Sequence, residues 1–261
     1  ISMLFGYQPT ENFNFYAGPV YQTIEGDVQL RGLAYGGNAT FGGYNASIKE
    51  TGDIGWLAGA AFQIPDIALK ASVTYRSEIE HSVNVKESFN SAGLLAGLNA
   101  APSLNTDITT PQSVNLDFQT GIMANTVAFA NVRWVDWSSF SIQPYKFGLA
   151  SKSAAIQAQT GKSEFDLVAY TDDQISATVG VGRKLNDQWA GNVSVGWDSG
   201  AGNPVTTLGP TEGYWNVGLG AQFSPTPQTF IAGGVKYFWL GDAKAQSGDQ
   251  FDTANYVADF E

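Results

Sequence analysis

The sequence of 261 residues contains no cysteine, and only 14% of its residues are charged. The lack of cysteine excludes a disulfide framework, thiolate metal ligands and cysteine nucleophiles. A soluble domain normally carries about 25% charged residues, so this chain is polar without being ionic. No apolar run approaches the roughly 18 residues that a transmembrane helix needs, since the longest extends only from Trp56 to Phe62. An outer-membrane β-barrel, however, spans the bilayer without such a run.

Basic residues and catalytic motifs are also scarce. The chain has 13 Lys and Arg against 24 Asp and Glu, a net charge of −11, and this acidic balance argues against nucleic-acid binding. There is no Walker or dinucleotide fingerprint and no G-x-S-x-G elbow. We therefore expect no cofactor, no metal site and no enzymatic activity. The single histidine, His81, leaves a Ser-His-Asp hydrolase open by residue count alone.

Apolar and polar residues alternate with a period of two along most of the chain, which is typical of strands with two different faces. In the clearest segment, Trp189, Val193 and Trp197 share one face, while Asn192 and Ser194 share the other. This pattern predicts about eleven strands, over residues 1–8, 13–24, 54–63, 69–76, 114–122, 128–135, 174–182, 188–198, 214–223, 230–239 and 254–260.

The connections between these strands are alternately short and long. Short turns on one side and long loops on the other are the asymmetry of bacterial outer-membrane barrels. A soluble antiparallel sandwich has no reason to separate its loops so regularly. The tight turns are predicted near Pro9, Pro65, Asn125, Asn186 and Pro225, and the long loops over 25–52, 81–111, 139–172, 199–212 and 241–252.

The two faces of the strands differ as lipid and an aqueous lumen require. The apolar face carries no charge over the central stretch of most strands, and the polar face is mostly Gly, Ser, Asn, Thr and Gln. In a sandwich the water-exposed face would carry Lys and Glu freely. Trp189 and Trp197 mark opposite ends of one strand, as interfacial aromatic girdles do. Six of the seven tryptophans have the apolar parity: Trp56, Trp134, Trp189, Trp197, Trp215 and Trp239.

These patterns predict an all-β protein, an antiparallel transmembrane β-barrel in the outer membrane of a Gram-negative bacterium. In hydrocarbon every strand edge must be paired, so a spanning sheet has to close on itself. Bacterial single-chain barrels have even strand numbers. Because eleven is odd, we expect residues 1–261 to form a single barrel domain that is incomplete at both ends.

Five segments, in this order along the chain, carry a resemblance to a known family. They are GWLAGAAFQIP at 55–65, ASVTYRSEIEHS at 71–82, TPQSVNLDF at 110–118, VRWVDWSSF at 132–140 and YTDDQISATVGVGRKLNDQWAGNVSVGWDSGAGNP at 170–204. They resemble the FadL/TodX-type outer-membrane transporters of long-chain fatty acids and other hydrophobic compounds. The resemblance implies a fourteen-stranded barrel plugged by an N-terminal hatch. This chain would correspond to its last eleven strands, without the hatch, the first three strands and the end of the last strand.

The resemblance also implies a first binding site, an apolar groove between two extracellular loops that correspond to 25–52 and 81–111. Apolar side chains in exposed loops need a partner surface. Two interpretations stay open. In the first, these side chains pack only on one another, so that the loops form a compact hood. In the second, the same hood also contains a groove for a ligand. Residues 91–101 are predicted to form a short helix. The candidate residues are Leu30, Leu33, Tyr35, Phe41, Tyr44, Phe89, Leu94, Leu95 and Leu98.

Three basic residues are candidates for holding a polar group of the ligand. The resemblance implies, for fatty-acid members, an arginine directly after an Ile-Glu pair, whereas this chain has Ile24-Glu25-Gly26. Arg31 is the nearest replacement, and Lys162 corresponds to a lysine of the family in a later loop. Arg76 lies on the polar face of its strand, where a purely structural salt bridge is the alternative. The missing arginine favours a neutral hydrophobic ligand over a carboxylate.

We therefore predict an outer-membrane transporter that takes up hydrophobic molecules passively through a loop groove and the barrel lumen. The expected partners are a hydrophobic small molecule (a fatty acid, a hydrocarbon or a detergent), outer-membrane lipid and lipopolysaccharide, but no nucleic acid. We expect a monomer. Two alternatives stay open: a general diffusion porin or structural barrel, and a lipid hydrolase with its serine near His81.

Overall fold

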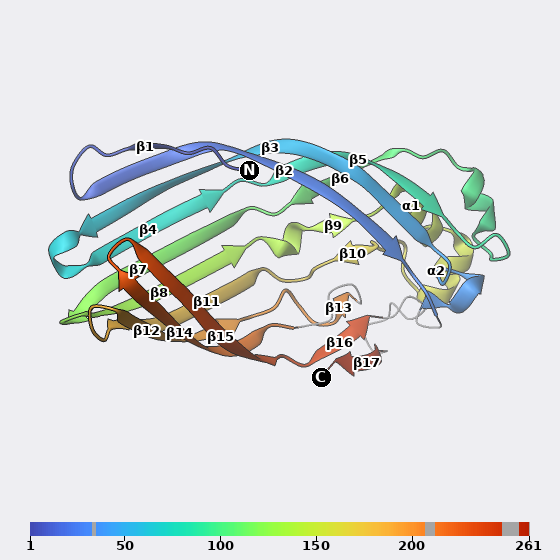
Figure 1. Ribbon diagram of the computed structural model, residues 1–261. Coiled ribbons are helices and arrows are strands. Elements are labelled where there is room, and N and C mark those ends of the chain that lie inside the picture. The colour runs from blue at the N-terminus through green and yellow to red at the C-terminus, as the bar shows by residue number, and fades with distance from the viewer. Residues whose placement is uncertain (33–34, 207–211, 247–255, 261) are drawn as a thin grey trace.

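The computed structural model describes residues 1–32, 35–206, 212–246 and 256–260. Its main element is a large antiparallel sheet whose wall strands follow one another in chain order (Figure 1). The tight turns lie at one end of the strands, and both α-helices lie at the other. The wall strands are β1 (Phe5–Tyr7), β2 (Phe13–Gln29), β3 (Asn45–Ile64), β4 (Leu69–Arg76), β7 (Ser113–Met123), β8 (Thr126–Val135), β11 (Gln174–Lys184), β12 (Trp189–Asp198), β14 (Tyr214–Thr226) and β15 (Thr229–Leu240).

The predicted tight turns are confirmed. A 3-10 turn, η3 (Pro65–Ile67), joins β3 to β4. Between β7 and β8 the chain reverses at Asn125, which has a φ of 57°. Asparagine tolerates this left-handed conformation better than most residues, so the turn follows from the local sequence.

The strand register lines up residues of one kind in rows across the wall. Val179 pairs with Val195, which pairs with Val217, so that an apolar row crosses β11, β12 and β14. One step along, Gly180 pairs with Ser194, which pairs with Gly218, on the opposite face. A slip of one residue would exchange the two faces, and the alternation therefore fixes the register.

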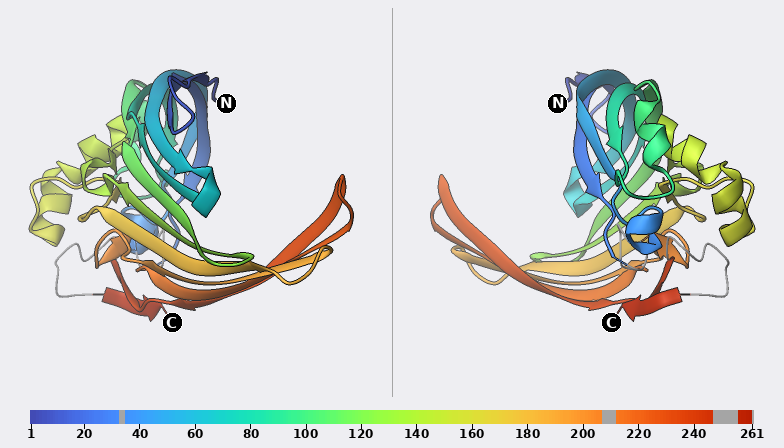
Figure 2. Two further views of the ribbon diagram at one scale, coloured as in Figure 1. Left: turned by 90° about the vertical axis from the view of Figure 1, so that its left-hand side faces the viewer. Right: turned by 90° about the vertical axis from the view of Figure 1, so that its right-hand side faces the viewer.

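The apolar face of the wall is the outer, uncovered face. Val179, Leu219, Ile231 and Val235 are all more than half exposed, and Figure 2 shows no second layer of structure against that side of the sheet. The sheet is curved (Figure 2), and we call its polar face, which carries Asn192, Ser194 and Gln222, the inner face. Within the described residues the sheet stays open, with β1 and β15 as its edges.

All five segments that the sequence predicts as loops contain strand residues, and the longest strand stretches lie in 25–52 and 81–111. β2 continues to Gln29, β3 begins at Asn45, and β5 (Ile79–Ser88) forms a hairpin with β6 (Asn105–Thr110). The register of β2 and β3 shifts between Ile24 and Gly26, where β3 contributes an extra residue. At such a bulge the residues of β3 that face inward change from odd-numbered to even-numbered positions. The alternation of apolar and polar residues along the sequence is therefore interrupted there.

The helical segments are short. They are α1 (Tyr145–Ser151), α2 (Ala154–Thr160) and the 3-10 turns η2 (Gly37–Ala39), η4 (Ala96–Ala100) and η5 (Trp137–Ser139). The helix expected over 91–101 is therefore only the 3-10 turn η4. No helix among the described residues has the length and apolar character to cross a membrane.

The last predicted strand, 254–260, lies partly outside the described residues. Its described part, β17 (Tyr256–Phe260), pairs with β16 (Ala243–Gln246), which directly follows β15. β16 also pairs with β13 (Val205–Thr206), and the remaining short strands β9 (Ser141–Ile142) and β10 (Val168–Ala169) pair with each other. Ten of the eleven predicted strands thus follow one another in the wall.

Candidate functional site

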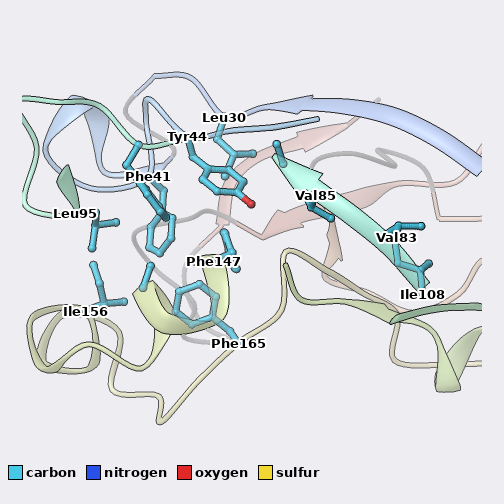
Figure 3. Packing of buried hydrophobic residues seen from close by; sticks show 13 residues of the cluster. Leu30, Phe41, Tyr44, Val83, Val85, Leu95, Ile108, Phe147, Ile156 and Phe165 are labelled. Carbon is cyan, nitrogen blue, oxygen red and sulfur yellow. The ribbon is translucent and has the colours of Figure 1, made fainter. Parts of the chain in front are cut away.

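An apolar cluster closes the helical end of the sheet, and we call it the hood core. Its aromatic rings come from the β2–β3 connection, from Phe89 directly after β5, from α1 and from the segment after α2. Figure 3 shows the rings of Phe41, Tyr44, Phe147 and Phe165 together. The ring centroids of Phe41 and Phe147 are 5.0 Å apart, and those of Tyr44 and Phe89 are also 5.0 Å apart. Each such aromatic pair contributes about 0.5–1.5 kcal/mol beyond the burial of its area. The buried members are Leu30, Phe41, Tyr44, Ala46, Val83, Val85, Phe89, Leu95, Ile108, Phe147, Ala150, Ile156 and Phe165.

The structure brings together most of the predicted apolar loop residues. Tyr35 and Leu98 are half-buried and pack against the hood core. Leu94 is the exception, since it is 68% exposed, and Leu33 lies outside the described residues. Fully buried in the hood core are Leu30, Phe41, Tyr44, Phe89 and Leu95.

A buried carboxylate links the strands of the hood to its first helix. Glu87 on β5 accepts hydrogen bonds from the backbone N–H groups of Lys146 and Phe147, both at 2.8 Å, and from the hydroxyl of Tyr44 at 2.8 Å. A carboxylate at a helix start satisfies N–H groups that have no partner inside the helix. Burial, followed by the negative charge of Glu87, raises the pKa of Tyr44 far above its ordinary value.

The three predicted cations lie at three different places. The Arg31 guanidinium donates to the carbonyls of Leu30 and Tyr44 at 2.7 and 3.0 Å, and its other nitrogen bonds the side chains of Gln29 and Asn45. Arg31 thus joins the two ends of the β2–β3 connection. Lys162 follows α2, and Arg76 lies on the inner face of β4, opposite Ser113.

His81 lies buried on β5 where the hood meets the wall. Its Nε2 is 3.4 Å from the side-chain oxygen of Gln22, which also accepts a hydrogen bond from Thr110 at 2.9 Å. Among the described residues its Nδ1 has no hydrogen-bond partner. A catalytic triad needs a serine on one ring nitrogen and a carboxylate on the other. The described residues around His81 provide neither.

The inner face of the wall carries a groove with a volume of about 970 Å³ across β8, β11, β12, β14 and β15. Its depth comes from glycines that stand opposite larger inner side chains. Gly180 is paired with Phe129 and Gly220 with Asn192, and in both cases the larger side chain occupies the space that a Cβ of the glycine would need. At Gly218 the hydroxyl of Ser194, its partner on β12, occupies that space. Sequence reasoning missed this groove because the pairs form only once the register is known.

An antiparallel wall with an uncovered apolar outer face, a polar inner face, tight turns at one end and a hood at the other defines an outer-membrane β-barrel protein. The profile of the family described as outer membrane protein transport protein (OMPP1/FadL/TodX) matches residues 3–261, and the chain belongs to this family. Its location is therefore the outer membrane of a Gram-negative bacterium.

Solved structures with a similar fold agree with this assignment. The chain is similar to the CymD monoaromatic hydrocarbon channel (TM-score 0.56, 13% identity), with 92% of this chain and 67% of that chain covered. It is also similar to the Pseudomonas putida toluene transporter TodX (TM-score 0.54, 13% identity), with 90% and 62% covered. For the Ralstonia pickettii toluene transporter TbuX the TM-score is 0.51 and the identity 11%, with 90% and 60% covered. The chain thus spans about three fifths to two thirds of these structures. No curated protein matches its sequence.

Proposed function

We propose that the complete protein carries small hydrophobic molecules passively across the outer membrane, from the hood into the lumen. The observation that carries this proposal is the position of an apolar hood at the entrance of a wall whose inner face is polar and glycine-lined. An apolar molecule would bind at the hood because apolar surface is removed from water there.

We further propose that the hood receives neutral hydrophobes in preference to fatty acids. Arg31 uses both terminal nitrogens of its guanidinium for neutral acceptors within the hood, so a carboxylate would have to break these bonds to reach it. Arg76 lies on the inner face at the end of β4 and is not a member of the hood core. The similar structures are a monoaromatic hydrocarbon channel and two toluene transporters, which supports the same class of ligand.

Among the described residues of the predicted loop set, Leu94 stays exposed, and we propose that it contributes to the first contact with substrate. Substitution Leu94→Asn should lower the rate of toluene uptake by two- to fivefold at limiting concentration, because one leucine contact is worth about 1 kcal/mol. The matched control is Leu185→Asn, since Leu185 is equally exposed, at 65%, but lies in a tight turn at the opposite end. If both variants take up toluene at the wild-type rate, capture at Leu94 is refuted.

A further inference from the structure

A small cavity lies at the helical end of the wall, where β12 ends and β11 and β14 begin, and we call it the aromatic cavity. Its volume is about 190 Å³. Sites for drug-sized ligands have volumes of roughly 300–1,000 Å³, so the occupant of this cavity is a small molecule or a small group. Three of its lining side chains are aromatic, namely Trp137, Tyr170 and Tyr214.

Trp137 and Tyr170 form a pair of rings at one side of this cavity. Trp137 begins η5, shortly after β8, and Tyr170 lies in the loop that leads into β11. Their ring centroids are 5.1 Å apart at an interplanar angle of 58°, and Phe140 packs on both rings at 5.2 and 5.9 Å. Because the face of an aromatic ring is electron-rich, rings that line a cavity attract a cation.

The aromatic cavity is also lined by a buried carboxylate. Asp198 is only 6% exposed and is the cross-strand partner of Tyr214. It accepts hydrogen bonds from the amide of Gln174 at 2.9 and 3.0 Å and from the backbone N–H of Gly200 at 2.8 Å, and these donors are neutral. Of the described residues that line the cavity, none is a lysine or an arginine. A buried charge without a counter-charge is costly, so this carboxylate favours a cationic ligand.

Two further carboxylates approach the turn of residues 200–202, which lines the same cavity. A Cβ at Gly200 would lie 2.7 Å from Oε1 of Glu212, and a Cβ at Gly202 would lie 3.1 Å from Oδ2 of Asp172. The Oε1 atom of Glu212 accepts from the backbone N–H of Gly202 at 3.3 Å, whereas its Oε2 is buried and has no hydrogen-bond partner among the described residues. Burial, together with the charges of Asp172 and Asp198, raises the pKa of Glu212. The negative charges here thus destabilise one another, and a cation would relieve this repulsion.

The arrangement of these groups suits an organic cation better than a metal ion. Within the part of the chain that the structure describes, no group of three acidic or histidine side chains is placed to hold a metal. An alkylammonium ion needs no such convergence, because its charge is spread over a larger surface that aromatic rings contact directly.

We propose that the aromatic cavity binds the ammonium group of a small organic cation, with Trp137 and Tyr170 against its methyl or methylene groups and Asp198 as its charge partner. The ligand class is that of amines and quaternary ammonium compounds. The inference goes beyond the proposed function, since it concerns a charged ligand and a site that shares no residue with the hood core.

The test uses labelled choline, bound to the complete protein in a non-ionic detergent and measured by equilibrium dialysis. Unlabelled choline and 3,3-dimethyl-1-butanol, in which carbon replaces the ammonium nitrogen, compete for the site. Because the two molecules have nearly the same shape, their difference reports the charge. The alcohol should need at least a fivefold higher concentration than choline to displace the label at low salt, and added salt should reduce this difference.

Two substitutions test the lining residues. Trp137→Leu should weaken choline binding at least fivefold, whereas Trp137→Phe should keep most of the affinity because it keeps a ring. The matched control is Trp215→Leu, since Trp215 is a 56% exposed tryptophan on the outer face of β14. Asp198→Asn should weaken choline binding and reduce its salt dependence, whereas Asp66→Asn, in the tight turn at the opposite end, should not. Heat-modifiable mobility on a gel verifies that each variant is folded.

The site is refuted if the alcohol displaces the label at the same concentration as choline, or if Trp215→Leu weakens choline as strongly as Trp137→Leu. Saturable binding of calcium without any binding of choline would also refute it, because the carboxylates would then serve a metal ion. Toluene uptake without choline binding would contradict this inference alone, and choline binding without toluene uptake would contradict only the proposed function.

Discussion

The carboxylate of Glu87 accepts a hydrogen bond from the backbone N–H of Phe147, sixty residues further along the chain, at 2.8 Å. Glu87 belongs to β5 and Phe147 to the first turn of α1, so this bond connects the strand part of the hood to its helical part. Phe147 in turn packs on Phe41 and Tyr44. The hood core is therefore assembled from three connections that are distant in sequence, with one buried acid at the junction.

Replacing this acid should loosen α1 without affecting the wall. In Glu87→Gln the amide NH₂ faces a backbone N–H, so one acceptor is lost and two donors oppose each other. We expect the local free energy of opening of α1 to fall by about 2 kcal/mol, measured by hydrogen–deuterium exchange of residues 145–151. Glu80→Gln is the control on the exposed face of the same strand. Equal protection of α1 in the wild type and in Glu87→Gln would contradict the assigned role.

The hood should lose stability at alkaline pH. The pKa of Tyr44 is raised by burial and by the charge of Glu87, whereas an unfolded tyrosine ionises near pH 10. A raised folded pKa means that the stabilisation is fully present below about pH 10 and is lost as the pH rises toward the folded value. We therefore expect constant α1 protection between about pH 7 and 9 and a decline above about pH 10.

Tyr44→Phe provides the check on this pH dependence. It should lower protection at every pH, because the bond to Glu87 is gone, and it should reduce the alkaline decline. A decline that begins below about pH 8 in the wild type would show that a group other than Tyr44 controls the hood.

A new charge should destabilise the protein at one residue of β11 but have little effect at its neighbour. Val179 points outward and is 56% exposed, whereas Thr178 points to the inner face. An arginine on the lipid side at mid-strand costs about 2–4 kcal/mol, whereas one in the lumen costs little. Denaturant titration of the complete protein in lipid vesicles should show this loss for Val179→Arg and less than about 1 kcal/mol for Thr178→Arg. Equal losses would contradict the assignment of the two faces.

The wall strands could be predicted from the sequence because the alternation of apolar and polar residues that marks them is local. In β12 each side chain faces either lipid or the inner face, so Trp189, Val193 and Trp197 alternate with polar residues without interruption. The hairpin of β5 and β6 escaped prediction because its buried face includes His81 and Glu87, two polar residues that break the apolar series. The bulge in β3 also interrupts the alternation, and residues 45–48 beyond it were therefore not predicted as strand.

The hood and the groove depend on long-range pairing, which a single sequence does not reveal. The predicted loop residues Phe41, Tyr44 and Phe89 do meet, but the partner from α1, Phe147, was missed because that helix is only seven residues long. The groove pairs, such as Gly180 with Phe129, become recognisable only once the register is known. The hood core residues pack on one another, whereas Leu94, which we predicted with them, is 68% exposed.

The most direct test of the account is the relative uptake of two solutes of similar size, toluene and arabinose, by cells that lack their own hydrocarbon channels and express the complete protein. Passive transport of hydrophobes predicts faster accumulation of labelled toluene than in cells without the protein, insensitivity to an uncoupler, and an unchanged rate for arabinose. Equal acceleration of both solutes would identify a general diffusion porin, and no acceleration of toluene would contradict the proposed function outright.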